Sequence, residues 1–187
     1  VSEHLASLRG GEQDVRILMG EQVAEQYDFS AHKVLMDIGG MAGAWCIAIR
    51  RRYPHLQCLV YDLPFNCQIA ETILAEAGQS DYIKPVPGNF FTEELPTGAD
   101  VMLLANVLHD WTPERDRIIL GKVHRALPKN GILLVTEFFF EDDWSGPVGW
   151  GAHQAYMVLG SEGATGWQGE MWKIISGKAP MFYLRVK

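Results

Sequence analysis

The feature that most constrains the fold is an alternation of short apolar runs and helical stretches that begins near residue 33. The apolar run at 101–107 lacks a polar–apolar alternation, as expected for a strand covered on both faces of a parallel sheet. The alternation as a whole predicts an α/β domain with a doubly wound, Rossmann-like, mostly parallel sheet. The apolar runs are 33–38, 57–61, 82–85, 101–107 and 132–136, and the helical stretches are about 43–53, 66–77 and 112–127.

Charge and length narrow the class of protein. The chain has 187 residues and a net charge of −7, and its basic residues are scattered except for Arg50–Arg52. That cluster is expected to end a helix, where cations are favourable, and no basic face for nucleic acid is expected. The longest uncharged apolar run, Val101–Leu108, is far shorter than the roughly 20 residues of a membrane span. We therefore expect a small-molecule partner, with neither nucleic acid nor membrane.

The cysteines and histidines argue against a metal site. Three cysteines, at positions 46, 58 and 67, form no C-x-x-C pair, and the six histidines show no ligand spacing. An odd number of cysteines in or beside apolar runs is typical of reduced thiols. We expect a cytoplasmic protein without a structural metal.

A glycine cluster follows the first apolar run. Asp37 closes that run, and Gly39, Gly40 and Gly43 follow it. Glycines allow a tight strand-to-helix turn and a close approach of the backbone to a ligand. Asp62 closes the second run, where an acid can accept hydrogen bonds from ribose hydroxyls. Because ligands bind at the carboxyl ends of parallel strands, this pattern predicts a nucleoside-type cofactor.

The residues of the turn also discriminate between cofactors. A dinucleotide places its pyrophosphate against such a turn, where the carboxylate of Asp37 would repel it, whereas S-adenosylmethionine (SAM) carries an ammonium and a sulfonium that a carboxylate favours. The turn also departs from G-x-G-x-x-G, because Met41 and Ala44 stand where glycines would help. SAM is therefore favoured over NAD.

In order and spacing, six motifs resemble those of the small-molecule O-methyltransferases of plant phenolic and bacterial polyketide metabolism. The resemblance covers about residues 25–175 and implies the SAM-methyltransferase fold. The motifs are Tyr27-Asp-Phe-Ser, Asp37-Ile-Gly-Gly-x-x-Gly, Tyr61-Asp-Leu-Pro, Gly88-Asn-Phe-Phe, Leu108-His-Asp-Trp and Leu134-Val-Thr-Glu.

The resemblance implies a role for each group of residues. It makes His109 the general base and Glu137 the acid that orients the imidazole. It places the acceptor against Trp150, His153 and Met157. The residues that it assigns to SAM are Asp37, Gly39, Gly40, Gly43, Asp62, Leu63, Gly88, Asn89, Phe90, Asn106 and Trp111.

A histidine base fits an acidic hydroxyl. A phenol with a pKa near 10 exceeds an imidazole near 6.5 by about 3.5 units, a gap that concerted proton transfer can bridge. An aliphatic alcohol leaves a far larger gap. We therefore expect a phenolic acceptor.

The chain departs from the family at several points. Asn89 stands where the family has an aspartate, and Met41 replaces a common glycine. We expect residues 1–30 to be a helical lead-in, the remnant of a missing dimerisation domain, and residues 31–187 to be the catalytic domain. The C-terminal hairpin is expected to be shortened. The resemblance implies a homodimer, and we expect the segment that makes the dimer to be missing here.

Three hypotheses follow for the function. The first is a SAM-dependent O-methyltransferase with His109 as its base. The second is a methyltransferase-like module that binds SAM with little or no catalysis, which Asn89 and the missing segments suggest. The third, a nicotinamide enzyme, is disfavoured by Asp37 and by the glycine spacing.

Overall fold

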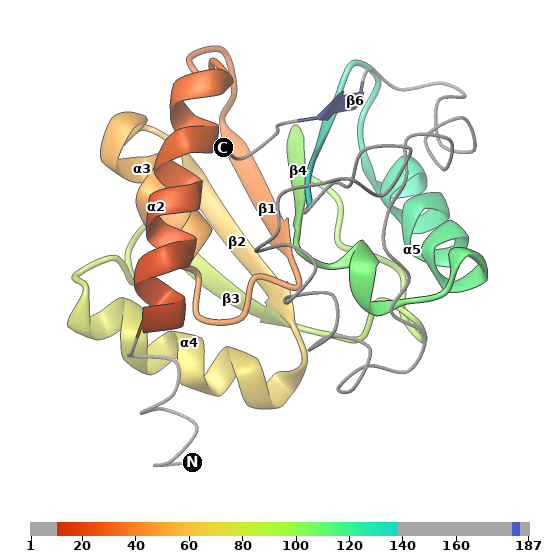
Figure 1. Cartoon of the computed structure of the whole chain (residues 1–187), viewed down its shortest axis with the longest axis horizontal. Coiled ribbons are helices and arrows are strands. Elements are labelled where there is room, and N and C mark those ends of the chain that lie inside the picture. Colours follow the sequence, from red (N-terminus) through yellow and green to blue (C-terminus); the bar gives the residue numbers. More distant parts are fainter. Residues whose placement is uncertain (1–10, 138–180, 184–187) are drawn as a thin grey trace, which may run out of the picture.

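The computed structural model describes residues 11–137 and the backbone of residues 181–183, and it confirms the doubly wound parallel sheet (Figure 1). Six strands lie in the order β3-β2-β1-β4-β5-β6, and all five strand pairs are parallel. The strands are β1 (Val34–Ile38), β2 (Gln57–Asp62), β3 (Ile83–Pro87), β4 (Val101–Ala105), β5 (Ile132–Thr136) and β6 (Met181–Tyr183). The helices are α2 (Gly11–Gln26), α3 (Ala44–Arg52), α4 (Pro64–Glu76), the 3-10 helix η1 (Leu108–Asp110) and α5 (Pro113–Ala126).

Alternate residues of the central strands pack on opposite faces of the sheet. Leu35 and Leu103 belong to an apolar cluster with side chains of α2, α3 and α4. Met36 and Met102, one position further along the same strands, pack in a second cluster with side chains of α5. In Figure 1 helices α2, α3 and α4 accordingly lie on one side of the sheet and α5 on the other. Both faces are therefore covered, which explains the unbroken apolar run of β4.

The helix ends follow local sequence signals. The three arginines at 50–52 occupy the last turn of α3, as expected. Helix α4 begins at Pro64, two residues before the predicted start, because proline fits the first turn of a helix, whose N–H groups have no intrahelical partner. Gly78 follows α4 with a φ of +65°, the left-handed conformation that ends a helix.

The carboxyl ends of the strands form one edge. Backbone hydrogen bonds continue the sheet beyond the strands, from Gly39 N to Tyr61 O (2.8 Å), from Gly88 N to Asp62 O (2.9 Å) and from Asn106 N to Thr136 O (2.9 Å). The loops that follow β1 and β3 therefore start against the end of β2, and the loop that follows β4 starts against the end of β5. This edge is where a doubly wound sheet binds its ligand.

Helix α2 packs directly on the domain core. Met19, Val23 and Ala24 are buried in the same cluster as α3, and a Cβ on Gly20 would lie 2.7 Å from Ala48 Cβ. The division of the chain at residue 30 stays a prediction, and the C-terminal hairpin lies outside the described residues except for β6. Within the described part of the chain, none of the helices combines the length and apolar character needed to cross a bilayer.

Candidate active site

The loop after β1 bends tightly around the side chain of Asp37. Gly39 and Gly43 have φ values of +76° and +77°, in the left-handed region that favours glycine. Gly40 is required for a different reason, because a Cβ at this position would lie 2.5 Å from Asp37 Oδ2. The glycine cluster thus lets the backbone close over a buried carboxyl group.

Met41 adopts a conformation that is unusual for its residue type. Its φ is +46°, so a side chain stands at a left-handed position where the family commonly has glycine. Its backbone N–H donates to Asp62 Oδ2 at 2.8 Å. The strain of a non-glycine residue in this region persists only where the surroundings hold it, and it is concentrated at functional sites.

Asp62 braces the same turn from the end of β2. Besides the N–H of Met41, its carboxylate accepts hydrogen bonds from Leu63 N (2.7 Å) and from Asn66 Nδ2 (2.8 Å). It is 8% exposed and lies at the edge predicted for the cofactor. The structure thus brings Asp62 and the glycine turn together, and the contact of Asp62 with ribose stays a prediction.

Asp37 is buried without full hydrogen bonding. Its residual exposure is 1%, and Oδ1 has no hydrogen-bond partner within the described residues. Burial, with a contribution from the nearby charge of Asp62, raises the pKa of Asp37 to about 7, although Arg16 acts in the opposite direction. Burying a carboxyl group with an unpaired oxygen lowers the stability of the fold unless a cationic group pairs with it.

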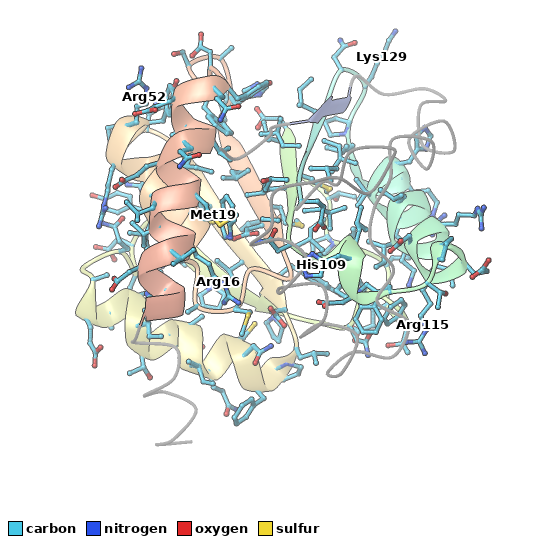
Figure 2. The ribbon with its side chains drawn as sticks, viewed as in Figure 1. Arg16, Met19, Arg52, His109, Arg115 and Lys129 are labelled. Carbon is cyan, nitrogen blue, oxygen red and sulfur yellow. The ribbon has the colours of Figure 1, made fainter. Side chains whose placement is uncertain are left out.

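Arg16 is a residue of this site that the sequence reasoning missed. It lies on α2, and its guanidinium contacts Met41 Sδ at 3.0 Å, so it reaches the glycine turn (Figure 2). The residue belongs to a segment that we expected to be only a helical lead-in. The available signal was a charged residue within the weak apolar stripe of that helix.

The loop after β3 carries Gly88, Asn89 and Phe90, three of the residues that the resemblance assigns to SAM. A Cβ on Gly88 would lie 2.4 Å from the hydroxyl oxygen of Tyr61, so only glycine fits there. Asn89 Oδ1 accepts a hydrogen bond from Phe91 N at 2.9 Å and thereby closes the local turn. The side-chain carbonyl of Asn89 is thus engaged by the backbone of its own loop.

Trp111 packs against this loop. Its ring lies 4.7 Å from that of Phe91 and 6.0 Å from that of Phe90, in edge-to-face geometry. Arg115 stacks over Trp111 at 5.3 Å. The aromatic cluster joins the loop after β3 to the start of α5, next to η1.

His109 and Glu137 form a buried pair. Glu137 Oε2 lies 2.5 Å from His109 Nδ1, while Oε1 accepts hydrogen bonds from the N–H groups of Val107 (3.0 Å) and Leu108 (2.8 Å). Glu137 is 1% exposed and His109 is 8% exposed. A carboxylate held by two backbone donors fixes the imidazole, with Nδ1–H donating to it, while Nε2 lies 3.5 Å from Asp110 Oδ1.

The surroundings of His109 set its proton affinity. Burial alone would lower the pKa of His109, but the hydrogen bond and the charge of Glu137, together with Asp110 and Asp116, raise it above the usual value. An imidazole with an increased proton affinity is a stronger base. Figure 2 shows His109, the central residue of η1, near the middle of the molecule.

The loop after β4 connects the two centres. A Cβ on Gly39 would lie 2.9 Å from Val107 Cγ2, and the N–H of Val107 donates to Glu137. Asn106 has a φ of +55° and a buried Oδ1 without a partner among the described residues. The glycine turn and the His109–Glu137 pair therefore share one edge and adjoin each other. The predicted acceptor residues Trp150, His153 and Met157 lie outside the described residues.

Comparison with known proteins agrees with this geometry. The chain is 39% identical over 146 residues to 3-hydroxy-5-methyl-1-naphthoate 3-O-methyltransferase of Streptomyces sahachiroi, covering 78% of this chain and 42% of the relative. It is 34% identical over 131 residues to L-tyrosine C(3)-methyltransferase of Streptomyces lavendulae, covering 70% of this chain and 36% of that protein. The chain thus spans well under half the length of these curated relatives.

The fold is shared with a solved relative. Human N-acetylserotonin methyltransferase, in complex with SAM, superposes with a TM-score of 0.82 at 26% identity, covering 93% of this chain and 49% of the other. The SAM-methyltransferase fold is therefore confirmed. The sequence profile of the O-methyltransferase domain matches residues 2–179. The chain belongs to the O-methyltransferase domain family of SAM-dependent methyltransferases.

Proposed function

We propose that this domain binds SAM at the glycine turn and transfers its methyl group to a hydroxyl oxygen of a small aromatic acceptor. His109 acts as the general base and Glu137 orients it. The observation that carries the proposal is the 2.5 Å contact between His109 Nδ1 and Glu137 Oε2. This pair adjoins the glycine turn that encloses the buried carboxyl group of Asp37.

The residues of the turn fit the chemistry of SAM. Asp37 offers a buried carboxyl oxygen that has no partner within the described residues, and a cationic ligand would complete it. Asp62 would hold ribose, and Arg16, which reaches the same turn, would pair with the carboxylate of the methionine moiety. When bound, SAM supplies an activated methyl group on a sulfonium.

The base removes the proton that the acceptor must lose. As the new O–CH3 bond forms and the S–CH3 bond breaks, the hydroxyl proton passes to His109 Nε2. Glu137 stabilises the resulting imidazolium, since its charge lies against Nδ1. Alignment of the acceptor oxygen with the methyl group supplies much of the acceleration.

The acceptor class rests on the relatives and on the base. The naphthoate methyltransferase acts on an aromatic hydroxyl, and the tyrosine C(3)-methyltransferase on a ring carbon. A histidine base favours an acidic hydroxyl, so we propose a phenol, bound against Trp150, His153 and Met157. The homodimer and the cytoplasmic location stay predictions of the resemblance.

Labelled methyl transfer tests the proposal. The full chain is incubated with methyl-labelled SAM and a panel of phenols and hydroxynaphthoates, and the products are assigned to O- or C-methylation. His109→Asn is expected to lower the rate by about 10²–10⁴-fold, the usual contribution of a general base, without changing the Kd for SAM. His124→Asn, an exposed histidine of α5, is the matched control. Full activity of His109→Asn, or SAM binding without transfer to any acceptor, would overturn the proposal.

A further inference from the structure

Helix α5 places a carboxyl group in its apolar stripe. Asp116 falls on the same face as Ile119, Val123 and Ala126, three buried residues of the α5 side of the core. Asp116 is 2% exposed, and neither of its carboxyl oxygens has a hydrogen-bond partner within the described residues. A purely structural buried acid would be hydrogen-bonded, as Glu137 is, so Asp116 needs another explanation.

The ionisable groups around Asp116 include the proposed base, His109, and its partner Glu137. It interacts electrostatically with Glu137 at the end of β5, with His109 and Asp110 of η1, and with Arg117 on its own helix. The interaction is mutual, because Asp116 is also one of the acids that raise the pKa of His109. Leu108 of η1 and Val135 of β5 pack in the same buried cluster as Ile119 of α5. The two buried carboxyl groups and the imidazole therefore lie within electrostatic reach of one another.

We propose that Asp116 is a positioning residue for the histidine base, forming with His109 and Glu137 a buried cluster of three proton-binding groups in which the second carboxyl sets the proton affinity of the imidazole. Its role in catalysis depends on the proposed function. The coupling between Asp116 and His109 does not, and it can be measured without any substrate.

The cluster has a defined charge at each pH. Burial, reinforced by Glu137 and Asp110 and opposed by His109 and Arg117, raises the pKa of Asp116 to about 8. Near neutral pH Asp116 is thus protonated, and Glu137 and Asp110 compensate a proton on His109. As the pH rises through 8, Asp116 ionises, and its charge strengthens the imidazole as a base. Groups coupled in this way titrate together, in steps that belong to the cluster.

Proton NMR of the histidine rings tests this coupling in the full chain. The chain has six histidines, and the signal missing from His109→Asn identifies that of His109. In the wild type we expect the His109 signal to shift in two steps, one for its own protonation and a second near pH 8 that reports Asp116. In Asp116→Asn, which is isosteric and neutral, the second step is expected to vanish, while the first, which takes place with Asp116 protonated, stays in place.

Glu114→Gln is the control, since it removes an exposed carboxylate from the same turn of α5 and should leave both steps in place. A single-step titration of His109 in the wild type, or identical curves for the wild type and Asp116→Asn, would overturn the proposal. If the asparagine variant does not fold, Asp116→Ala is expected to give the same loss of the second step.

The pH profile of methyl transfer gives a separate readout. The wild type is expected to show a change in kcat/KM near pH 8, as Asp116 ionises, and this change is expected to be absent in Asp116→Asn. An unchanged profile with a changed NMR titration would count against His109 as the base, which is the proposed function. An unchanged NMR titration would count against the role of Asp116.

Discussion

Asp37 and Glu137 are two carboxyl groups of equal burial on one edge of the sheet, yet the protein treats them in opposite ways. Both are 1% exposed. Glu137 accepts hydrogen bonds from two backbone N–H groups, and its second carboxylate oxygen lies against Nδ1 of His109. Asp37 keeps one oxygen without a partner within the described residues, and its pKa is raised to about 7.

The difference shows that Glu137 has its hydrogen-bond partners within the fold, whereas Asp37 is left for a ligand to pair with. The charge of Glu137 is compensated inside the fold, so it can hold an imidazole in one orientation. The charge of Asp37 is poorly compensated by the described residues and is disfavoured until a cation arrives. The base is thus preorganised, whereas the cofactor turn stores electrostatic free energy that a cationic ligand releases.

The largest expected effect tests the preorganised group. In Glu137→Gln the amide NH2 would face His109 Nδ1 and force the proton onto Nε2, so the imidazole could no longer accept one there. We expect kcat to fall by about 10²–10⁴-fold and the free energy of unfolding to fall by about 1–3 kcal/mol, since a charged hydrogen-bond acceptor is lost. Initial rates and urea unfolding measure both. Wild-type activity in this variant would end the proposed role of Glu137.

The second prediction is that Asp37→Asn increases the free energy of unfolding, where Glu137→Gln lowers it. The pKa of Asp37 is about 7 in the folded chain against an ordinary value of 3.8, so this group costs stability progressively as the pH rises from about 4 to 7. Asp37→Asn removes that cost, which is at most about 4 kcal/mol for a difference of about 3 pKa units. Urea unfolding at pH 8 should show a more stable variant, and at pH 4 the gain should disappear.

The gain in stability should be accompanied by weaker binding of SAM. A variant that is both more stable and a weaker binder would match a carboxyl group reserved for a ligand. A loss of stability at pH 8 would instead show that Asp37 is compensated in the fold and would remove the contrast with Glu137.

The third prediction concerns the pH dependence of binding. Because SAM favours the ionised form of Asp37, its affinity should fall as the pH drops below about 7, by up to about tenfold per unit. Calorimetry in buffers of different ionisation enthalpy should detect a proton released on binding near pH 6.5. In Asp37→Asn this proton release should disappear, and its persistence would point to a different titrating group.

The smallest expected effect tests whether Arg16 contacts the carboxylate of SAM. Arg16→Met is expected to weaken SAM binding by about tenfold, the value of a partly exposed charge-assisted hydrogen bond. The binding of methylthioadenosine, which lacks the amino-acid part, should be unchanged. Arg52→Met, an exposed arginine of α3, controls for net charge (Figure 2). Equal losses for both ligands would mean that Arg16 supports the turn and does not contact the carboxylate.

Much of this edge could be predicted from the sequence, because strand ends carry their own signals. Asp37, Asp62 and Glu137 each close an apolar run, and parallel strands bring such ends to one edge. Arg16 and Asp116 could not be placed in the same way, because a helical residue meets its partners through packing. Asp116 does fall at helical spacing with Ile119 and Val123, a periodicity that indicates a buried face but not what lies opposite.

The sequence by itself determined the parallel sheet, the glycine turn and the order of the acids along the edge, since these depend on local propensity and on strand direction. The tertiary structure decided which carboxyl groups are compensated. Hydrogen bonding and desolvation depend on neighbours from distant parts of the chain, such as the N–H groups of Val107 and Leu108 that hold Glu137. The same residue type therefore positions a base at one strand end and remains incompletely paired at another.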